Sequence, residues 1–204
     1  ITQYGGTGKC LVCSISPMTD IPIDSNVGGY FGPFLKFSGF DVIELTGKAE
    51  EDVIIVIDGN KGTVSIEKAP LEHKDAHVLG EELTTMYAED DNDRKNVAVV
   101  CSGSAADHCN LSMLNFTFYD PKRNVVRLKQ AGRGGIGRVF ADKHIKALVC
   151  HFKGVKANLN HVYDISILNR DGLKFHREVA TQDDKQNSMR KSLSLIHISE
   201  PTRH

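Results

Sequence analysis

A glycine-rich turn, a short apolar segment and an extended apolar run occur in the same order twice in this chain. The first copy has its glycine turn at residues 28–32, and the second has it at residues 134–137. Each turn is followed by a short helix-compatible piece and then by an extended run, at 41–46 in the first copy and 145–151 in the second. We therefore expect two glycine-turn, short-helix and strand units related by a pseudo-twofold axis.

The second turn has the spacing G-x-G-x-x-G over residues 132–137, which is the fingerprint of a dinucleotide-binding strand–turn–helix unit. Only seven residues separate it from the run that starts at Ile145, whereas a parallel crossover needs about a dozen. No Asp or Glu follows that run before Asp164, so the ribose-binding acid is missing. Residues 5–9 are not a P-loop either, because Cys10 stands where Ser or Thr would bind magnesium.

Composition indicates a globular chain without obvious polyanionic partners. The 204 residues carry a formal net charge of −1, which gives no reason to expect nucleic acid or an anionic membrane surface as a partner. The longest aliphatic run, residues 53–57, is far shorter than the roughly 20 residues of a membrane helix, so no membrane span is expected. The five cysteines form no disulfide or zinc pattern, because Cys10 and Cys13 lack a second pair at matching spacing. We expect reduced packing cysteines in a cytoplasmic protein.

The remaining segments predict a β-rich α+β domain. We expect strands over 9–16, 41–46, 96–101, 111–119, 125–128 and 145–151, a hairpin of 53–57 with 63–67, helices over 33–37, 81–89 and 138–143, and a loop over 18–25. The acidic run 89–93 is expected to be a solvated turn and not a metal site, because its carboxylates are adjacent in sequence.

Three regions are expected along the chain. Residues 1–156 should form the β-rich domain, with its start missing, and 157–192 should be the truncated start of a helical domain. Apolar residues at helical spacing over 159–173 support the second region. Residues 193–204 look like the translation of a sequencing adapter, and we set them aside as an artefact.

Basic residues flank the second glycine turn. Lys129, Arg133 and Arg138 surround backbone amides that no side chain separates from a ligand. Exposed amides with guanidinium groups suit a phosphate or an amide-rich heterocycle. The glycines alone are also compatible with tight turns that bind nothing. A non-catalytic nucleotide- or phosphate-binding domain using the same turns is a further alternative.

The two glycine motifs together resemble one family. The motifs are Asn26-x-Gly-Gly-Tyr-Phe-Gly-x-x-Leu-Lys-Phe-x-Gly-Phe-Asp41 and Ala131-Gly-Arg-Gly-Gly-Ile-Gly137 followed by Ile-Lys-Ala. Together with the hairpin between them, they are similar to the N-terminal domain of the aldehyde ferredoxin oxidoreductases over most of residues 5–158. Three further stretches are closer to one branch, the tungsten subunit of class II benzoyl-coenzyme A reductases: Cys10-x-x-Cys13, Asp24-Ser-Asn26 and Phe118-Tyr-Asp-Pro-Lys-Arg123.

The resemblance implies a tungsten–bis-molybdopterin cofactor whose phosphates are bridged by magnesium, and a 4Fe-4S cluster with ligands outside this sequence. Asn26 and Gln130 would offer backbone carbonyls to the magnesium, and no residue of this sequence is expected to be catalytic. Lys9 replaces an Arg of the aldehyde enzymes, which keeps the charge but loses bidentate geometry, and Lys129-Gln130 replaces an Arg-Ala pair. Carried over position by position, the cofactor-binding set is Lys9, Asn26, Gly28, Gly29, Lys129, Gln130, Gly132, Arg133, Gly134 and Gly135.

The resemblance also implies an activity for the whole protein. It would be a tungsten-pterin oxidoreductase that exchanges electrons with ferredoxin or an iron–sulfur electron-transfer subunit. Its substrate would be an aromatic acyl-coenzyme A, reduced in the ring, or an aldehyde, oxidised to the acid. A homo- or hetero-oligomer is compatible with this reading, and the fragment alone is expected to be inactive.

Overall fold

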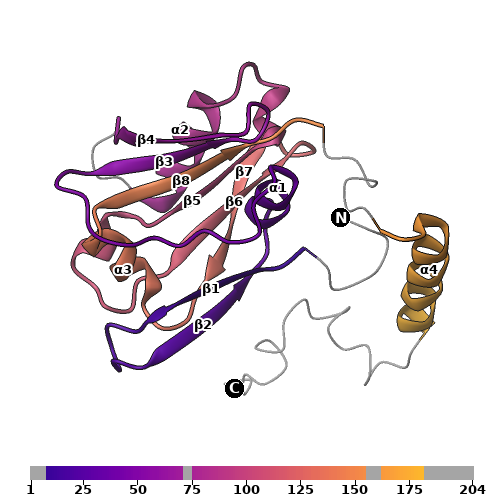
Figure 1. Cartoon of the computed structure of the whole chain (residues 1–204), viewed down its shortest axis with the longest axis horizontal. Coiled ribbons are helices and arrows are strands. Elements are labelled where there is room, and N and C mark those ends of the chain that lie inside the picture. Colours follow the sequence, from indigo (N-terminus) through magenta and orange to yellow (C-terminus); the bar gives the residue numbers. More distant parts are fainter. Residues whose placement is uncertain (1–7, 71–74, 155–161, 182–204) are drawn as a thin grey trace, which may run out of the picture. The chain divides into compact units, whose positions relative to one another are not determined.

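The computed structural model describes residues 8–70, 75–154 and 162–181 (Figure 1). The chain divides into two compact units. The larger unit spans Gly8–Leu159 and contains every described strand. The described part of the other unit is helix α4 (Ile165–Thr181) with the few residues before it.

A mixed six-stranded sheet forms the centre of the larger unit (Figure 1). Its strands lie in the order β4-β3-β8-β5-β6-β7, and β3 and β8 are its parallel neighbours, whereas the other neighbours are antiparallel. The predicted α+β class is confirmed. The strands are β3 (Val53–Asp58), β4 (Thr63–Lys68), β5 (Val97–Cys101), β6 (Leu114–Asp120), β7 (Val125–Ala131) and β8 (Ile145–His151).

Both faces of the sheet are covered, which explains why the central strands are apolar at successive positions. Helix α2 (Ala76–Met86) covers one face with Leu79 and Leu83. The other face is covered by α1 (Phe31–Phe37), α3 (Ile136–Asp142) and a separate two-stranded ribbon. Consecutive residues of β3 and β5 therefore belong to two different hydrophobic clusters.

The predicted loop over 18–25 is correct only for residues 18–21, because residues 22–25 belong to a two-stranded ribbon. The ribbon consists of β1 (Cys10–Ile15) and β2 (Pro22–Val27), which pair antiparallel along all six residues. Pro22 does not prevent this pairing because it is the first residue of its strand, where proline is tolerated. Val27 is buried against the sheet, so the ribbon holds the start of the first glycine turn in place.

The predicted strand over 41–46 is absent. Ile43 and Leu45 are partly buried against the core while Val42 is 78% exposed, so the alternation reflects burial of one side of an extended segment. No strand is available to pair with it beside β3, because β4 and β8 occupy both edges of that strand.

Two further predictions change in detail. The helix expected over 81–89 is α2, which begins five residues earlier. Its N-terminus is capped by the Asp75 carboxylate, which accepts hydrogen bonds from the N–H groups of His77 and Val78. The acidic run 89–93 is not wholly solvated, since the Asp93 side chain is only 7% exposed at the start of a short 3-10 helix, η1 (Asp93–Asn96). A second 3-10 helix, η2 (Ser104–Asp107), follows β5.

Helix α4 is the described part of the predicted helical region. Its first turn is capped by the Asp164 carboxylate, which accepts hydrogen bonds from the N–H groups of Ser166 and Ile167. Residues 159–161, where the helix was expected to begin, and the adapter-like stretch 193–204 lie outside the described residues. In the part of the chain that is described, no helix has the length and apolarity needed to cross a membrane.

Candidate functional site

The first glycine turn joins β2 to α1 and lies against β6. Gly29 has a φ of 99°, and a Cβ there would be 3.2 Å from the Thr117 carbonyl oxygen. Tyr30 follows, and its N–H donates to the same carbonyl oxygen at 3.5 Å. Gly29 is therefore required by backbone conformation and by close approach to β6.

The second glycine turn joins β7 to α3. Gly134 and Gly135 have φ values of 72° and 68°. A Cβ at Gly134 would lie 2.5 Å from the Ile23 side chain, and one at Gly135 would overlap the Asn110 carbonyl oxygen. These two glycines are also required by conformation and packing.

The two turns border one strip of the surface, because β2 lies beside the end of β7. A Cβ at Gly28 would be 3.9 Å from Lys129, the Arg133 N–H donates to the Ser25 hydroxyl at 3.3 Å, and Gly134 lies against Ile23. We call this strip the glycine-turn surface. It comprises Lys9, Gly28, Gly29, Lys129, Gly132 and Arg133.

Gly28 and Gly132 differ from the glycines that the fold requires. A Cβ at Gly132 would meet no atom within 4 Å, and one at Gly28 would make only ordinary contacts, at 3.9 Å. Neither has a φ in the left-handed region. The described fold therefore gives no reason for glycine at these two positions.

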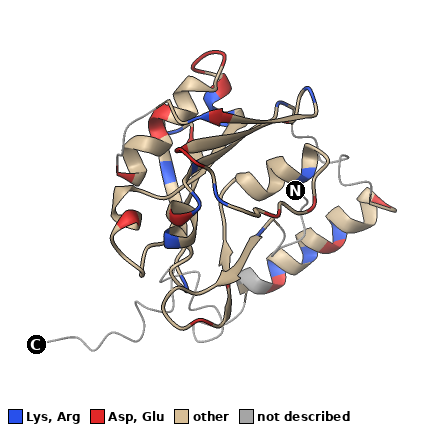
Figure 2. Ribbon diagram, turned by 60° about the vertical axis from the view of Figure 1, so that its left-hand side comes forward, with Lys and Arg blue, Asp and Glu red and all other residues tan. Residues whose placement is uncertain are grey.

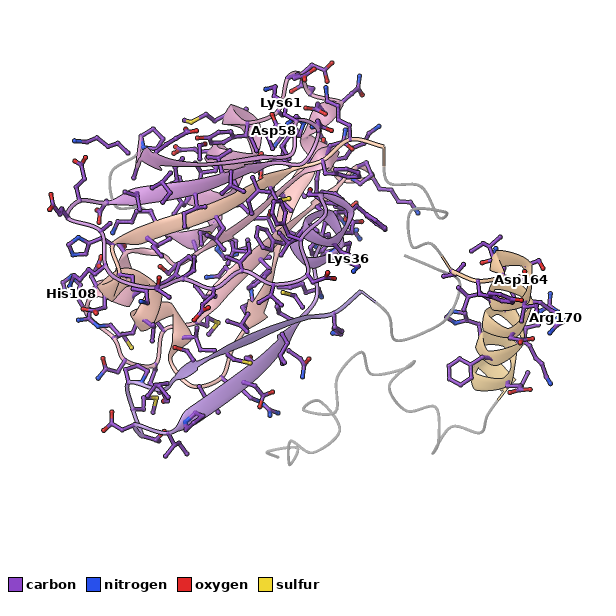
Figure 3. The ribbon with its side chains drawn as sticks, in the orientation of Figure 1. Lys36, Asp58, Lys61, His108, Asp164 and Arg170 are labelled. Atoms are coloured by element: carbon purple, nitrogen blue, oxygen red, sulfur yellow. The ribbon has the colours of Figure 1, made fainter. Side chains whose placement is uncertain are left out.

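Cations on the glycine-turn surface lack carboxylate partners. More than half of the Lys and Arg side chains in the described residues lie within 4 Å of a carboxylate. Lys61 is one of these, with its Nζ 2.8 Å from Asp58 at the β3–β4 loop (Figure 3). Within the same described residues, Lys9, Lys129 and Arg133 are exposed and form no ion pair. Their charge is available to an anionic ligand.

This surface is not part of a larger field of one sign. Figure 2 shows Lys and Arg together with Asp and Glu spread over the described elements. The electrostatic effect of the three unpaired cations is therefore confined to the neighbourhood of the two turns. Interactions between exposed charges that are more than about 10 Å apart are largely screened at ordinary salt.

Asn26 and Gln130 occupy corresponding positions. Each is exposed, and each stands two residues before the first glycine of its turn, Gly28 or Gly132. Asn26 is paired with Leu11 in the ribbon and Gln130 with Asn115 in the sheet. Their magnesium-binding role stays a prediction.

Arg138 is not part of this surface. Its guanidinium donates to the carbonyl oxygens of Ala106 and Asp107, so it fixes α3 to η2. The predicted repeat is present as a glycine turn and a seven-residue helix in both copies. In the second copy α3 leads into β8 as expected, whereas in the first copy residues 41–46 form no strand and the next strand is β3.

An aromatic group beside the first turn was missed by sequence reasoning. The Phe118 ring lies 5.9 Å from the Tyr30 ring, and the Lys129 Nζ lies 5.8 Å from the Phe118 centroid. The turn after Asp120 could have revealed this contact from the sequence. A hairpin there pairs Phe118 with Arg127 and places Lys129 diagonally across from Phe118 on the neighbouring strand.

None of the five cysteines belongs to a metal-ligand group in the described residues, and two of them are buried. All five are unpaired thiols, and burial raises the pKa of Cys150 to about 11 and that of Cys101 to about 12. Across residues 8–70, 75–154 and 162–181, no group of three or more His, Cys, Asp or Glu side chains is placed to hold a metal ion.

Comparison with known proteins identifies the relatives of this arrangement. Residues 1–152 match the family model of the aldehyde ferredoxin oxidoreductase N-terminal domain. The chain belongs to the aldehyde ferredoxin oxidoreductase family. It is 36% identical over 142 residues to the tungsten-containing aldehyde ferredoxin oxidoreductase of Pyrococcus horikoshii and 33% identical over 146 residues to that of Pyrococcus furiosus. These matches cover 70% and 69% of this chain and 21% of each relative.

A solved structure shows the same similarity in three dimensions. The active-site complex BamBC of benzoyl coenzyme A reductase with 1,5-dienoyl-CoA matches with a TM-score of 0.58 and 25% sequence identity. The match covers 74% of this chain and 21% of that one. Both predicted resemblances, to the aldehyde enzymes and to a benzoyl-coenzyme A reductase, are confirmed. The chain spans about a fifth of the length of these relatives.

Proposed function

We propose that the glycine-turn surface of this aldehyde ferredoxin oxidoreductase family member binds the tungsten–bis-molybdopterin cofactor of a larger oxidoreductase. The observation that carries the proposal is the coincidence of two features at both turns. Gly28 and Gly132 are glycines that the fold does not need, and Lys9, Lys129 and Arg133 are cations without carboxylate partners among the described residues.

These features suit the chemistry of a pterin that carries a phosphate. A flat heterocycle with amide-like edges needs exposed backbone N–H and C=O groups, and a glycine allows it to approach them. A phosphate needs nearby cations, and a guanidinium such as that of Arg133 can bind it with two parallel hydrogen bonds. Two turns would serve two pterins, with the backbone carbonyls of Asn26 and Gln130 contributing to a bridging magnesium ion.

The bound group would supply the redox chemistry, while this domain would bind and orient it. An iron–sulfur cluster, held by residues outside this sequence, would pass electrons to or from ferredoxin or an iron–sulfur subunit. We propose an aldehyde or an aromatic acyl-coenzyme A as substrate, on the basis of the names of the relatives. The whole protein would be an oxidoreductase of the cytoplasm.

The test compares cofactor content in the full-length protein and in a double variant, Lys129→Ala with Arg133→Ala. Each lost charge-assisted contact is worth about 1.5–3 kcal/mol, so the variant should retain less than about a tenth of the tungsten and pterin. Tungsten is measured by mass spectrometry, and pterin by its fluorescence after release.

The matched control is Lys61→Ala with Lys68→Ala, which removes two exposed cations that are already paired with Asp58 and Glu51. This control should keep its full tungsten and pterin content. Equal cofactor content in both double variants would overturn the proposal. A co-purified nucleotide with no tungsten or molybdenum would instead support a phosphate-binding domain without redox function.

A further inference from the structure

Lys129 is bounded by an aromatic ring on one side and by a glycine on the other. Its Nζ lies 5.8 Å from the centroid of the Phe118 ring, and its Cγ would be 3.9 Å from a Cβ at Gly28. A lysine has a flexible four-carbon stem, so an exposed ammonium without a carboxylate partner needs another contact to stay near the first turn.

The ring itself is held by the first glycine turn. Tyr30 packs its ring against Phe118 in an edge-on arrangement, with the centroids 5.9 Å apart, and lies 5.7 Å from Phe34 of α1. Because Phe34 is buried, this row of three rings is anchored in the core. Phe118 thereby connects the turn at Gly28–Gly29 with β7.

Arg127 also lies at the Phe118 ring, but unlike Lys129 it has a carboxylate partner. Its Cζ lies 5.6 Å from the ring centroid, and its Nη1 lies 3.5 Å from the Asp120 carboxylate. The charge of Arg127 is therefore partly neutralised within the fold, whereas Lys129 forms no ion pair in the described residues. Of the two cations at the ring, Lys129 is the one with charge to offer a ligand.

We infer that Phe118 is a positioning residue, whose ring face keeps the Lys129 ammonium beside Gly28 and so increases the affinity of the glycine-turn surface for phosphate groups. The inference rests on the proposed function, because it needs Lys129 to contact the phosphate. Phe118 touches the lysine and not the ligand. A cation–π contact at an exposed site strengthens binding about two- to fivefold.

The experiment titrates the chain with inorganic pyrophosphate and follows the backbone amide signals of Gly28, Lys129 and Gly132 by NMR. Phe118→Leu should weaken binding about two- to fivefold, while Phe118→Tyr, which keeps the ring, should bind like the unmodified chain. In Phe118→Leu the ring-current shift of the Lys129 εCH2 protons should also disappear. Phe37→Leu is the matched control, since its ring stacks on Phe152 at 6.1 Å and should not affect pyrophosphate.

A double-mutant cycle with Lys129→Ala separates the possible results. Phe118→Leu should have no further effect once Lys129 is alanine. Equal loss in both backgrounds, or loss with Phe118→Tyr as well, would show that the ring acts only on packing and would overturn the inference. If Lys129→Ala weakens pyrophosphate binding but Phe118→Leu has no effect, the inference about Phe118 is overturned and the proposed function is not. Pyrophosphate binding unchanged by Lys129→Ala would count against the proposed function and against this inference together.

Discussion

At the scale of single residues, the glycines of the two motifs have two different physical explanations. Gly29, Gly134 and Gly135 have left-handed φ values and sit where a Cβ would meet other atoms, so the fold alone accounts for them. Gly28 and Gly132 have neither property. Sequence similarity assigns the same cofactor-binding role to all five glycines. Only the structure separates the glycines that shape the turns from those whose missing side chain leaves room above the backbone.

This separation predicts opposite effects for two alanine substitutions in one turn. Gly132→Ala should leave the free energy of unfolding unchanged or raise it by about 0.4–1 kcal/mol, because alanine restricts the unfolded chain. It should also weaken pyrophosphate binding. Gly135→Ala should lower the free energy of unfolding by at least about 1–2 kcal/mol, since its φ is 68° and its Cβ would overlap Asn110. Urea unfolding and NMR titration measure both quantities, and a destabilised Gly132→Ala would contradict the assignment.

At the scale of secondary structure, the sequence predicted the strands of the six-stranded sheet better than the extended segments that pack against that sheet. Most strands and both short helices after the glycine turns were found from hydrophobic pattern and glycine position. The pattern failed at 41–46, where apolar and polar residues alternate but no strand pairs with the segment. Strand formation depends on pairing with segments that are distant in sequence, and both edges of β3 are already occupied by β4 and β8. It also failed at 22–27, where polar Asp24, Ser25 and Asn26 hid a strand that the neighbouring β1 stabilises.

Asp93 connects two elements, and its charge should contribute to stability in a pH-dependent way. Its carboxylate accepts hydrogen bonds from the Asn96 side chain and the Glu89 N–H, and lies 2.8 Å from His151 at the end of β8. Burial opposes its ionisation, but the hydrogen bonds and the charges of His151 and Lys153 prevail and lower its pKa. Stability from a lowered carboxyl pKa is present above the unfolded value of about 3.9 and is lost as the pH falls through the folded value.

Asp93→Asn should therefore lower the free energy of unfolding by about 1–3 kcal/mol near neutral pH. The difference from the unmodified chain should shrink as the pH falls below about 4, where the carboxylate becomes protonated. Urea unfolding at a series of pH values measures it, with Asp91→Asn, an exposed neighbour, as the control. A difference that does not change with pH would mean that the carboxylate charge itself adds no stability.

At the scale of the whole molecule, the glycine-turn surface belongs to a unit whose two hydrophobic clusters draw only on residues 10–152 of the described chain. The sequence predicted the two turns and their cations because those depend on local motifs. It did not predict which cations lie at the Phe118 ring or which glycines the fold requires, because these depend on β2, β6 and β7 meeting at one place. The family match ends at residue 152 as well.

A chain of residues 1–159 should therefore unfold as cooperatively as the 204-residue chain, with a melting midpoint that differs by less than about 2 °C, or under roughly 0.5 kcal/mol. A chain ending at residue 192, without the adapter-like stretch, should melt identically. The contrasting truncation ends at Lys143 and removes β8, which lies between β3 and β5, and it should show no cooperative transition. Calorimetry measures all four chains. A large drop in midpoint for residues 1–159 would show that the clusters of the larger unit depend on residues beyond them.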